Sequence, residues 1–268
     1  MDIEEFRELI LSNYRHAGRK FPWHGADPWG VMVSEFMLQQ TRTERVIPYW
    51  EKWMQKWPEP ELLAAASLEE AMRQWSGLGY NRRCYNLKSS AAIIAEKHGG
   101  KVPADTSALR LLPGIGPYIA GAVACFAYNK PSVFIETNIR SCVIHCFFPG
   151  RDNVSDAEIF PILEAALDRR NPRTWYYALM DYGAVLKKLT PNPGRRSAHY
   201  SRQSPFIGSF RQARGAVIRS LASMGPSSAK ELLVTSGLRE DKLYGVLERL
   251  KKESLVAEAG GIYRINDM

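Results

Sequence analysis

The sequence predicts a mainly α-helical protein that ends in a small α+β module. Apolar residues recur at helical spacing over roughly the first 220 residues, and strand-like alternation is nearly absent before residue 255. A chain of 268 residues, 45% hydrophobic and 24% charged, is long enough for one or two domains with buried cores. No apolar run approaches the ~20 residues that span a bilayer, so we expect no membrane partner.

Local signals mark the ends of the expected helices. Asp27-Pro28 is typical of a helix start, with Asp as cap and Pro at the first position. Ser67 and Glu70 form a capping-box pattern, and Gly99 is a helix-ending signal. Helices are therefore predicted at 4–14, 28–38, 67–75, 87–98, 106–112, 117–128, 156–169 and 175–188.

The C-terminal part has a different pattern. Residues 190–210 are rich in Pro, Gly, Ser and Arg and predict an irregular connection. Helices are expected at 211–224, 228–235 and 239–253, followed by a β-hairpin that turns at Gly260-Gly261. This order resembles a winged helix-turn-helix. The last helix mixes basic and acidic residues, so contact with phosphate, protein docking and a structural role all remain open.

The net charge of +8 is concentrated in one segment. Between Tyr182 and Lys230 there are nine Lys or Arg and no Asp or Glu. Such a segment indicates either a polyanion partner, most simply nucleic acid, or a solvated basic loop.

The run Leu112-Pro-Gly-Ile-Gly-Pro-Tyr118 predicts a tight turn between two helices. Gly114 and Gly116 permit the turn and leave backbone N–H groups open at the start of a helix that begins at Pro117. That arrangement suits a phosphate oxygen, so a DNA-backbone clamp is favoured over an ordinary helix–helix turn.

Glu35 lies in a helix, 29–38, that is apolar almost all round. Such a helix is normally buried, and burial favours the protonated carboxyl that a general acid needs. The alternative is a structural Glu at a cavity edge. The four cysteines form no disulfide scaffold and indicate a reducing compartment. Cys142, His145 and Cys146 superficially suggest a metal site, but buried small residues are favoured.

Three spaced motifs carry a resemblance: Ser34 to Thr41 (SEFMLQQT), Gly77 to Tyr80 (GLGY) and Leu112 to Ala122 (LPGIGPYIAGA). With 19–23 (RKFPW) and 46–49 (VIPY), they resemble the adenine DNA glycosylases of the MutY family, within the helix-hairpin-helix superfamily that includes endonuclease III. The match covers about residues 5–186. It implies a two-lobed helix-hairpin-helix DNA glycosylase fold: a six-helix lobe at 21–128, a second lobe from 1–20 and 129–210, and the winged-helix-like module at 211–268.

The resemblance also implies site residues. Glu35 aligns with the general acid that protonates the leaving base. A second set would wedge into the base stack or contact the opposite strand, and comprises Gln39, Gln40, Thr41, Leu78 and Tyr80. Tyr118 occupies the position of the Schiff-base Lys of lyase-competent relatives, so hydrolysis without strand cleavage is expected.

Departures from the family pattern are equally informative. The catalytic Asp of the family appears here as Glu136, followed by Asn138. The site is therefore either adapted to a different substrate or weakened in its activity, and a purely structural role for Glu136 is less favoured. The iron–sulfur ligands would fall on Lys187, Gly194, Ser197 and Gln203, none of which is Cys. We therefore expect no cluster, with a monovalent cation at the hairpin remaining an option. The basic residues expected to keep the DNA-backbone contact are Lys187, Lys188, Arg195, Arg196 and Arg202.

The leading hypothesis is a monofunctional DNA glycosylase of base excision repair that removes adenine opposite guanine or 8-oxoguanine. The alternatives are a thymine, uracil or other modified-base glycosylase and a non-catalytic DNA-binding protein on the same fold. A metal-dependent redox or lyase protein has less support. The expected partner is duplex DNA with a mismatched or damaged base. We expect a monomer in the cytoplasm, at the nucleoid if the source is prokaryotic, and no Nudix-related C-terminal module that reads 8-oxoguanine.

Overall fold

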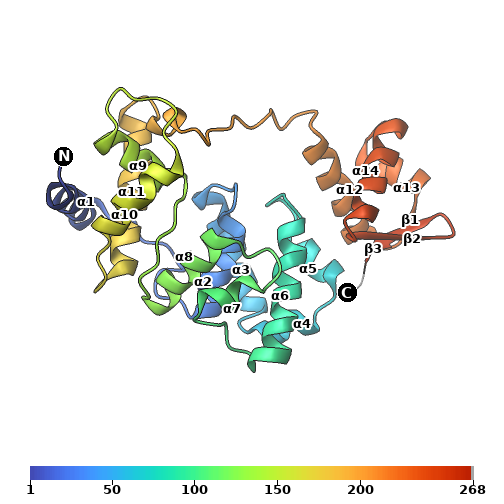
Figure 1. Ribbon diagram of the computed structural model, residues 1–268. Coiled ribbons are helices and arrows are strands. Elements are labelled where there is room, and N and C mark those ends of the chain that lie inside the picture. Colours follow the sequence, from blue (N-terminus) through green and yellow to red (C-terminus); the bar gives the residue numbers. More distant parts are fainter. Residues whose placement is uncertain (267–268) are drawn as a thin grey trace. The chain divides into compact units, whose positions relative to one another are not determined.

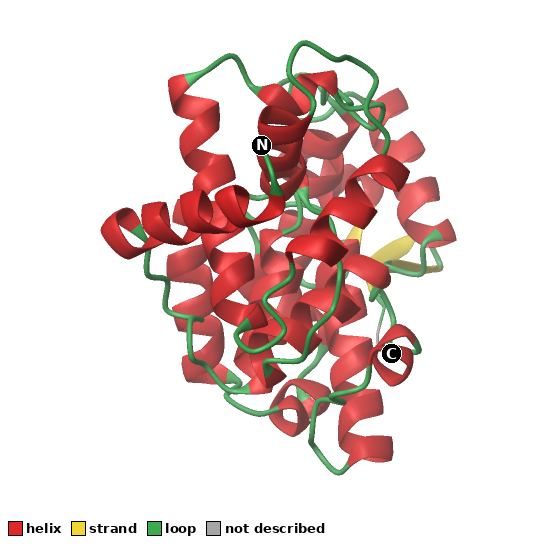
Figure 2. Cartoon of the chain, turned by 60° about the vertical axis from the view of Figure 1, so that its left-hand side comes forward, coloured by secondary structure: helices red, strands yellow, loops and turns green. Residues whose placement is uncertain are grey.

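The computed structural model describes residues 1–266 and is built mainly of helices, with one small sheet near its C-terminal end (Figures 1 and 2). The predicted mainly helical class is confirmed. None of the described helices is long and apolar enough to cross a membrane. The described residues form two compact units: residues 1–31, 104–110 and 115–202 make the first, and residues 32–103, 111–114 and 203–266 make the second. The three-part domain division proposed from the sequence stays a prediction.

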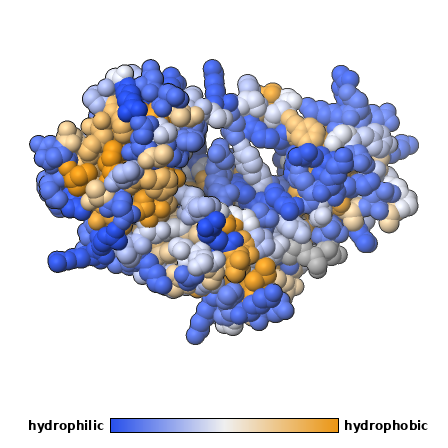
Figure 3. Space-filling model, viewed as in Figure 1, coloured by the Kyte–Doolittle hydropathy of each residue, from blue (hydrophilic) through white to orange (hydrophobic). Residues whose placement is uncertain are grey.

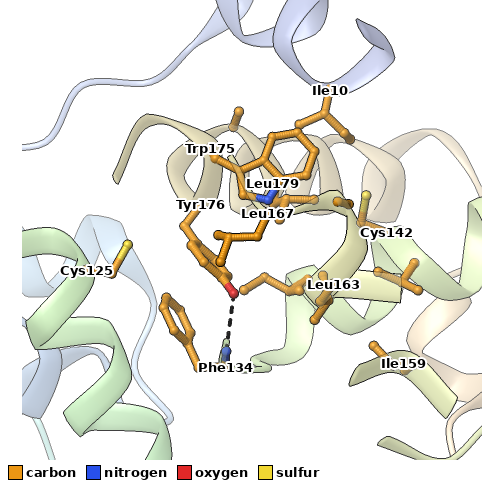
Figure 4. Close-up of a cluster of buried hydrophobic side chains, with 14 of the residues drawn as sticks. Ile10, Cys125, Phe134, Cys142, Ile159, Leu163, Leu167, Trp175, Tyr176 and Leu179 are labelled. Carbon is orange, nitrogen blue, oxygen red and sulfur yellow. Dashed lines mark hydrogen bonds between the residues drawn. The ribbon is translucent and has the colours of Figure 1, made fainter. Parts of the chain in front are cut away.

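The first unit consists of helices that surround one apolar core. They are α1 (Ile3–Ala17), α7 (Thr106–Arg110), α8 (Pro117–Tyr128), α9 (Thr137–Phe147), α10 (Asp156–Ala166), α11 (Pro172–Leu189) and the 3-10 turn η1 (Pro193–Arg196). Trp175 and Tyr176 lie at the centre of the core, with no measurable exposure (Figure 4). The Tyr176 hydroxyl accepts a hydrogen bond from the backbone N–H of Phe134 at 3.2 Å. This buried phenol therefore anchors the irregular segment that leads into α9.

The second unit contains the remaining helices of the N-terminal half and the whole C-terminal module. Its helices are α3 (Thr43–Lys56), α4 (Pro60–Ala65), α5 (Leu68–Trp75), α6 (Arg82–His98) and most of α2 (Pro28–Leu38), which begins in the first unit. Trp53 packs edge-on against Trp57 and Trp75, with ring centroids 4.6 and 5.5 Å apart. As predicted, Ser67 caps α5 by accepting from Glu70 N, and Gly99 ends α6 in the left-handed conformation. Only this half of the predicted capping box forms, because the Glu70 carboxylate pairs with Lys56 at 2.6 Å.

The C-terminal module has the predicted helices and hairpin. It comprises α12 (Phe210–Met224), α13 (Ala229–Ser236), α14 (Glu240–Lys252) and the strands β1 (Ser227–Ser228), β2 (Val256–Ala259) and β3 (Ile262–Ile265). The antiparallel sheet has the order β1-β3-β2, and Gly260 and Gly261 both have positive φ in the turn. The face of this module drawn in Figure 3 is predominantly hydrophilic.

Several predicted helix boundaries differ from the structure. Helix α6 begins at Arg82 rather than residue 87, and α10 ends at Ala166 rather than residue 169. In addition, α1 continues to Ala17 rather than residue 14, α7 ends at Arg110 rather than residue 112, and α11 begins at Pro172 rather than residue 175. The strand β1 was not predicted, because two residues are too short to show an alternating pattern. Since Ser227 and Ser228 pair with Tyr263 and Ile262 of β3, the strand exists through a long-range partner.

Candidate active site and nucleic-acid interface

Glu35 lies in the middle of α2, in the second unit. Asp27 starts this helix as predicted, because its carboxylate accepts from the backbone N–H of Gly30 at 2.7 Å. Glu35 is only 3% exposed, and its neighbours Ser34 and Phe36 are also buried. A carboxyl group held away from water on a rigid helix is well suited to hold and deliver a proton.

The polar loop after α2 leads to the predicted wedge residues. Gln39 and Thr41 are partly buried, whereas Gln40 is exposed and has a φ of +56°. In the second loop Leu78 is 5% exposed, while Tyr80 is 38% exposed and has a φ of +49°. Residues other than Gly rarely adopt positive φ, and such conformations cluster at ligand-binding sites. Within the second unit, the exposed tips of the two loops are therefore Gln40 and Tyr80.

Arg83 joins these two loops and was not singled out from the sequence. Its guanidinium is buried between the rings of Trp75 and Tyr80, 5.3 Å from each ring centroid. It donates to the carbonyl oxygens of Phe36, Met37, Gln39, Leu78 and Gly79 and to the Thr41 hydroxyl, at 2.5 to 3.2 Å. Burial lowers the pKa of Arg83 to about 10, which leaves it charged at neutral pH. Arg83 is thus a positioning residue for both loops.

The glycine-rich turn has the predicted hairpin geometry between α7 and α8. Gly114 has a φ of +79°, and a Cβ there would lie 2.5 Å from the Asn86 amide nitrogen. Gly116 caps α8, and a Cβ on it would meet open space. Both glycines are exposed. The N-terminus of α8 therefore presents backbone N–H groups that no neighbouring side chain covers at Gly116, as a phosphate-binding turn requires.

Glu136 is the N-cap of α9, in the first unit. One carboxylate oxygen, Oε1, accepts from the backbone N–H groups of Asn138 and Ile139 at 2.6 and 2.7 Å. Burial raises the pKa of Glu136, against the opposing effects of these two N–H groups, Lys187 and Arg140. The pKa of Lys187 is lowered, because burial of its ammonium outweighs the opposing effect of the negative charge on Glu136. The helix end thus fixes the orientation of a carboxyl group in a poorly solvated place.

A close helix contact brings Lys187 to this site. Gly183 on α11 lies so near α9 that a Cβ on it would be 2.1 Å from the carbonyl oxygen of Asn138. Lys187 follows one turn later on the same face of α11, and its ammonium donates to Asn138 Oδ1 at 2.7 Å. Asn138 therefore orients a cation beside Glu136. Tyr118, also in the first unit, packs edge-on against Phe134 at 5.8 Å between ring centroids.

The basic segment divides into structural and exposed residues. Arg196 donates to the carbonyl oxygens of Phe148, Ile144 and Arg151, at 2.5, 3.3 and 3.4 Å, and so caps the C-terminal end of α9. Lys187 is likewise used inside the fold. Lys188, Arg195 and Arg202 are exposed. Of the five predicted backbone-contact residues, these three have side chains at the surface.

We expect Arg196→Ala to lower the free energy of unfolding by about 1–3 kcal/mol, because it leaves the carbonyl oxygens at the end of α9 without their donor. The matched variant Arg195→Ala should change it by less than about 0.5 kcal/mol, as is usual for an exposed side chain. Urea unfolding at neutral pH measures both variants. Equal effects would contradict the structural role of Arg196.

The residues at the iron–sulfur positions do not fit a cluster. An ammonium, a hydrogen, a hydroxyl and an amide replace the four thiolates at Lys187, Gly194, Ser197 and Gln203. Within residues 1–266, no three His, Cys, Asp or Glu side chains are grouped as metal ligands. Cys142 is buried and hydrogen-bonded to Cys146, and burial raises its pKa, which disfavours the thiolate that binds metal.

Comparisons with known proteins identify relatives of this chain. Residues 33–164 match the model of the HhH-GPD superfamily base excision DNA repair proteins. The chain is 38% identical to an adenine DNA glycosylase of Mycolicibacterium smegmatis over 78% of both chains. It is 35% identical to one of Mycobacterium tuberculosis, over 92% of this chain and 88% of that protein. A solved thermostable thymine-DNA glycosylase has a TM-score of 0.62 and 26% identity, covering 68% of this chain and 86% of that one.

The fold and the matches define the class: this is a helix-hairpin-helix DNA N-glycosylase of base excision repair. Within that class, the chain belongs to the adenine DNA glycosylase family.

Proposed function

We propose that the protein flips adenine out of duplex DNA, opposite guanine or 8-oxoguanine, and hydrolyses its N-glycosidic bond. The observation that carries this proposal is the carboxyl group of Glu136, fixed at the N-terminus of α9 with Lys187 and Asn138 beside it. Glu35 supplies the second carboxyl group, buried on α2. Relatives at 35–38% identity are adenine glycosylases, which favours adenine over thymine or uracil and an enzyme over a non-catalytic protein.

In the proposed reaction, the bond between the sugar C1′ and the base nitrogen breaks, and its electron pair goes to the base. Glu35 gives the departing base a proton. The ionised Glu136 stabilises the positive charge that develops on the sugar. Water supplies the hydroxyl that ends on C1′ and the proton that restores Glu35. No amine is present at residue 118, so the strand stays intact.

The other parts of the proposal concern binding. Gln39, Gln40, Thr41, Leu78 and Tyr80 contact the opened base stack, and opening it costs a few kcal/mol that such contacts offset. The turn at Gly114 and Gly116, with Lys188, Arg195 and Arg202, holds the phosphates. We propose a monomer that needs no iron–sulfur cluster.

A base-release assay tests the proposal. Short duplexes would carry adenine opposite guanine or 8-oxoguanine, or thymine or uracil opposite guanine, and alkali would cleave each abasic site. We expect cleavage of the adenine strands alone, and none of any strand before alkali. Release of thymine or uracil instead of adenine would overturn the base assignment, and release of no base would favour the binding-only alternative.

A further inference from the structure

The C-terminal module adjoins the loops that carry Gln40 and Tyr80, within the second unit. Helix α12 packs beside α5 (Figure 1), and the Arg73 guanidinium donates to the carbonyl oxygen of Ala222 at 2.8 Å. Arg82 donates to the carbonyl oxygen of Glu253, at the end of α14. These contacts attach the module next to the loop 77–80.

A cavity of about 770 Å³ lies between α12 and the two loops. That volume is within the range of about 300–1,000 Å³ found for small-ligand sites. The side chains that line it include four arginines, two from the α3 end and two from α12, and only one acidic residue: Arg42, Arg45, Arg211, Arg219 and Glu44. The site is thus suited to an anion.

Tyr80 and Arg211 form a wall of this cavity. Arg211 donates to the Tyr80 hydroxyl at 2.9 Å, and its carbon Cζ lies 5.9 Å from the centre of the Tyr80 ring. Gln203 also donates to this hydroxyl. A second cavity, of about 520 Å³, shares Tyr80 and Arg211 in its lining. Aromatic and arginine side chains stack on bases, and arginine pairs with phosphate in a bidentate way.

We propose that this cavity is a nucleotide site for the substrate DNA, in which Arg211 and Arg219 of α12 bind backbone phosphate and the rings of Tyr80 and Phe206 contact an unstacked base. Phe206 supports this assignment, because it lines the cavity and is 57% exposed. The C-terminal module then acts in DNA binding itself. This inference rests on the proposed function for the identity of its ligand, DNA.

Glu35 lies near this site along the chain. Gln40 follows it by five residues and lies two residues beyond the end of α2, so the two Cα atoms are at most about 17 Å apart at the extended-chain limit of ~3.3–3.6 Å per residue. A nucleotide held by Gln40, Tyr80 and α12 is therefore close to the helix that carries the general acid. The site contacts DNA next to the flipped base rather than at a remote position.

The test compares the double variant Arg211→Ala/Arg219→Ala with Arg239→Ala, a matched control. Arg239 belongs to the same module, pairs with exposed Asp241, and lines neither cavity. The ligand is a duplex with a stable abasic analogue, and Kd is measured from 50 to 200 mM salt. We expect at least ~10-fold weaker binding at 100 mM salt and a log–log salt slope smaller by about 2, because two phosphate contacts are lost.

Further measurements keep the outcomes separable. Arg211→Lys keeps the positive charge but loses the planar guanidinium that binds phosphate through two hydrogen bonds. Its salt slope should therefore stay close to that of the unmodified protein. This variant keeps the test readable where the double variant folds poorly. The single-turnover excision rate at saturating protein should be unchanged in the control variant Arg239→Ala, whose side chain lines neither cavity. Binding by the double variant that equals that of Arg239→Ala overturns the site, and weaker binding with an unchanged slope overturns the phosphate assignment. Lack of excision in the unmodified protein would refute the proposed function and leave the binding result readable.

Discussion

Glu35→Gln should lower the single-turnover rate of adenine excision by about 10²–10⁴-fold, the usual contribution of a general acid. The amide has nearly the same shape as the carboxyl group and cannot release a proton at neutral pH. Because Glu35 is 3% exposed, no solvent proton donor at the same place can readily replace it. Affinity for a duplex with a stable abasic analogue should stay within about threefold, since the site keeps its shape.

The control for this change is Glu51→Gln, which makes the same substitution at an exposed position of α3. Its excision rate should equal that of the unmodified protein. A Glu35→Gln variant that keeps more than a third of the rate would exclude Glu35 as the acid, whatever the affinity shows.

Glu136→Gln should reduce the same rate by about 10²–10³-fold, because a neutral amide does not stabilise the cationic sugar. The amide oxygen can still accept from the N–H groups of Asn138 and Ile139, so α9 keeps its cap. Glu136→Asp retains the charge and should be far more active than the Gln variant. Equal activities of the Asp and Gln variants would contradict a charge-based role.

The same substitution should stabilise the fold at neutral pH. Because the pKa of Glu136 is raised in the folded protein, the folded state binds more protons than the unfolded state between the ordinary and the raised pKa. Stability of the unmodified protein therefore falls as pH rises through that interval. The melting temperature of Glu136→Gln should exceed that of the unmodified protein above the interval, and the difference should shrink as pH falls through it. A lower melting temperature at pH 7.5 would show that the ionised carboxylate is the better cap.

The sequence predicted what local chemistry decides. Caps at Asp27, Ser67 and Gly99 lie where predicted, as does the turn at Gly260. Each depends on a few neighbouring residues, so its signal is present in a short window. The motif resemblance supplied the family, and the site positions that it implies stay predictions.

What the sequence did not reveal depends on distant partners. Arg83 contacts carbonyl groups more than 40 residues away, and nothing in its own segment marks it. Arg196 was expected at DNA, yet its guanidinium lies at the end of α9. Arg211 reaches the Tyr80 hydroxyl across 131 residues. Basic residues look alike in a sequence, and only the fold separates those that tie the chain together from those that face a ligand.

The position of Arg83 has a mechanical consequence. A single guanidinium donates to the segments after α2 and before α6 and packs against the Tyr80 ring, so one planar group ties the two loops together. The two loops therefore form one connected surface rather than two independent segments. We therefore expect bound DNA to deform more than these two loops do.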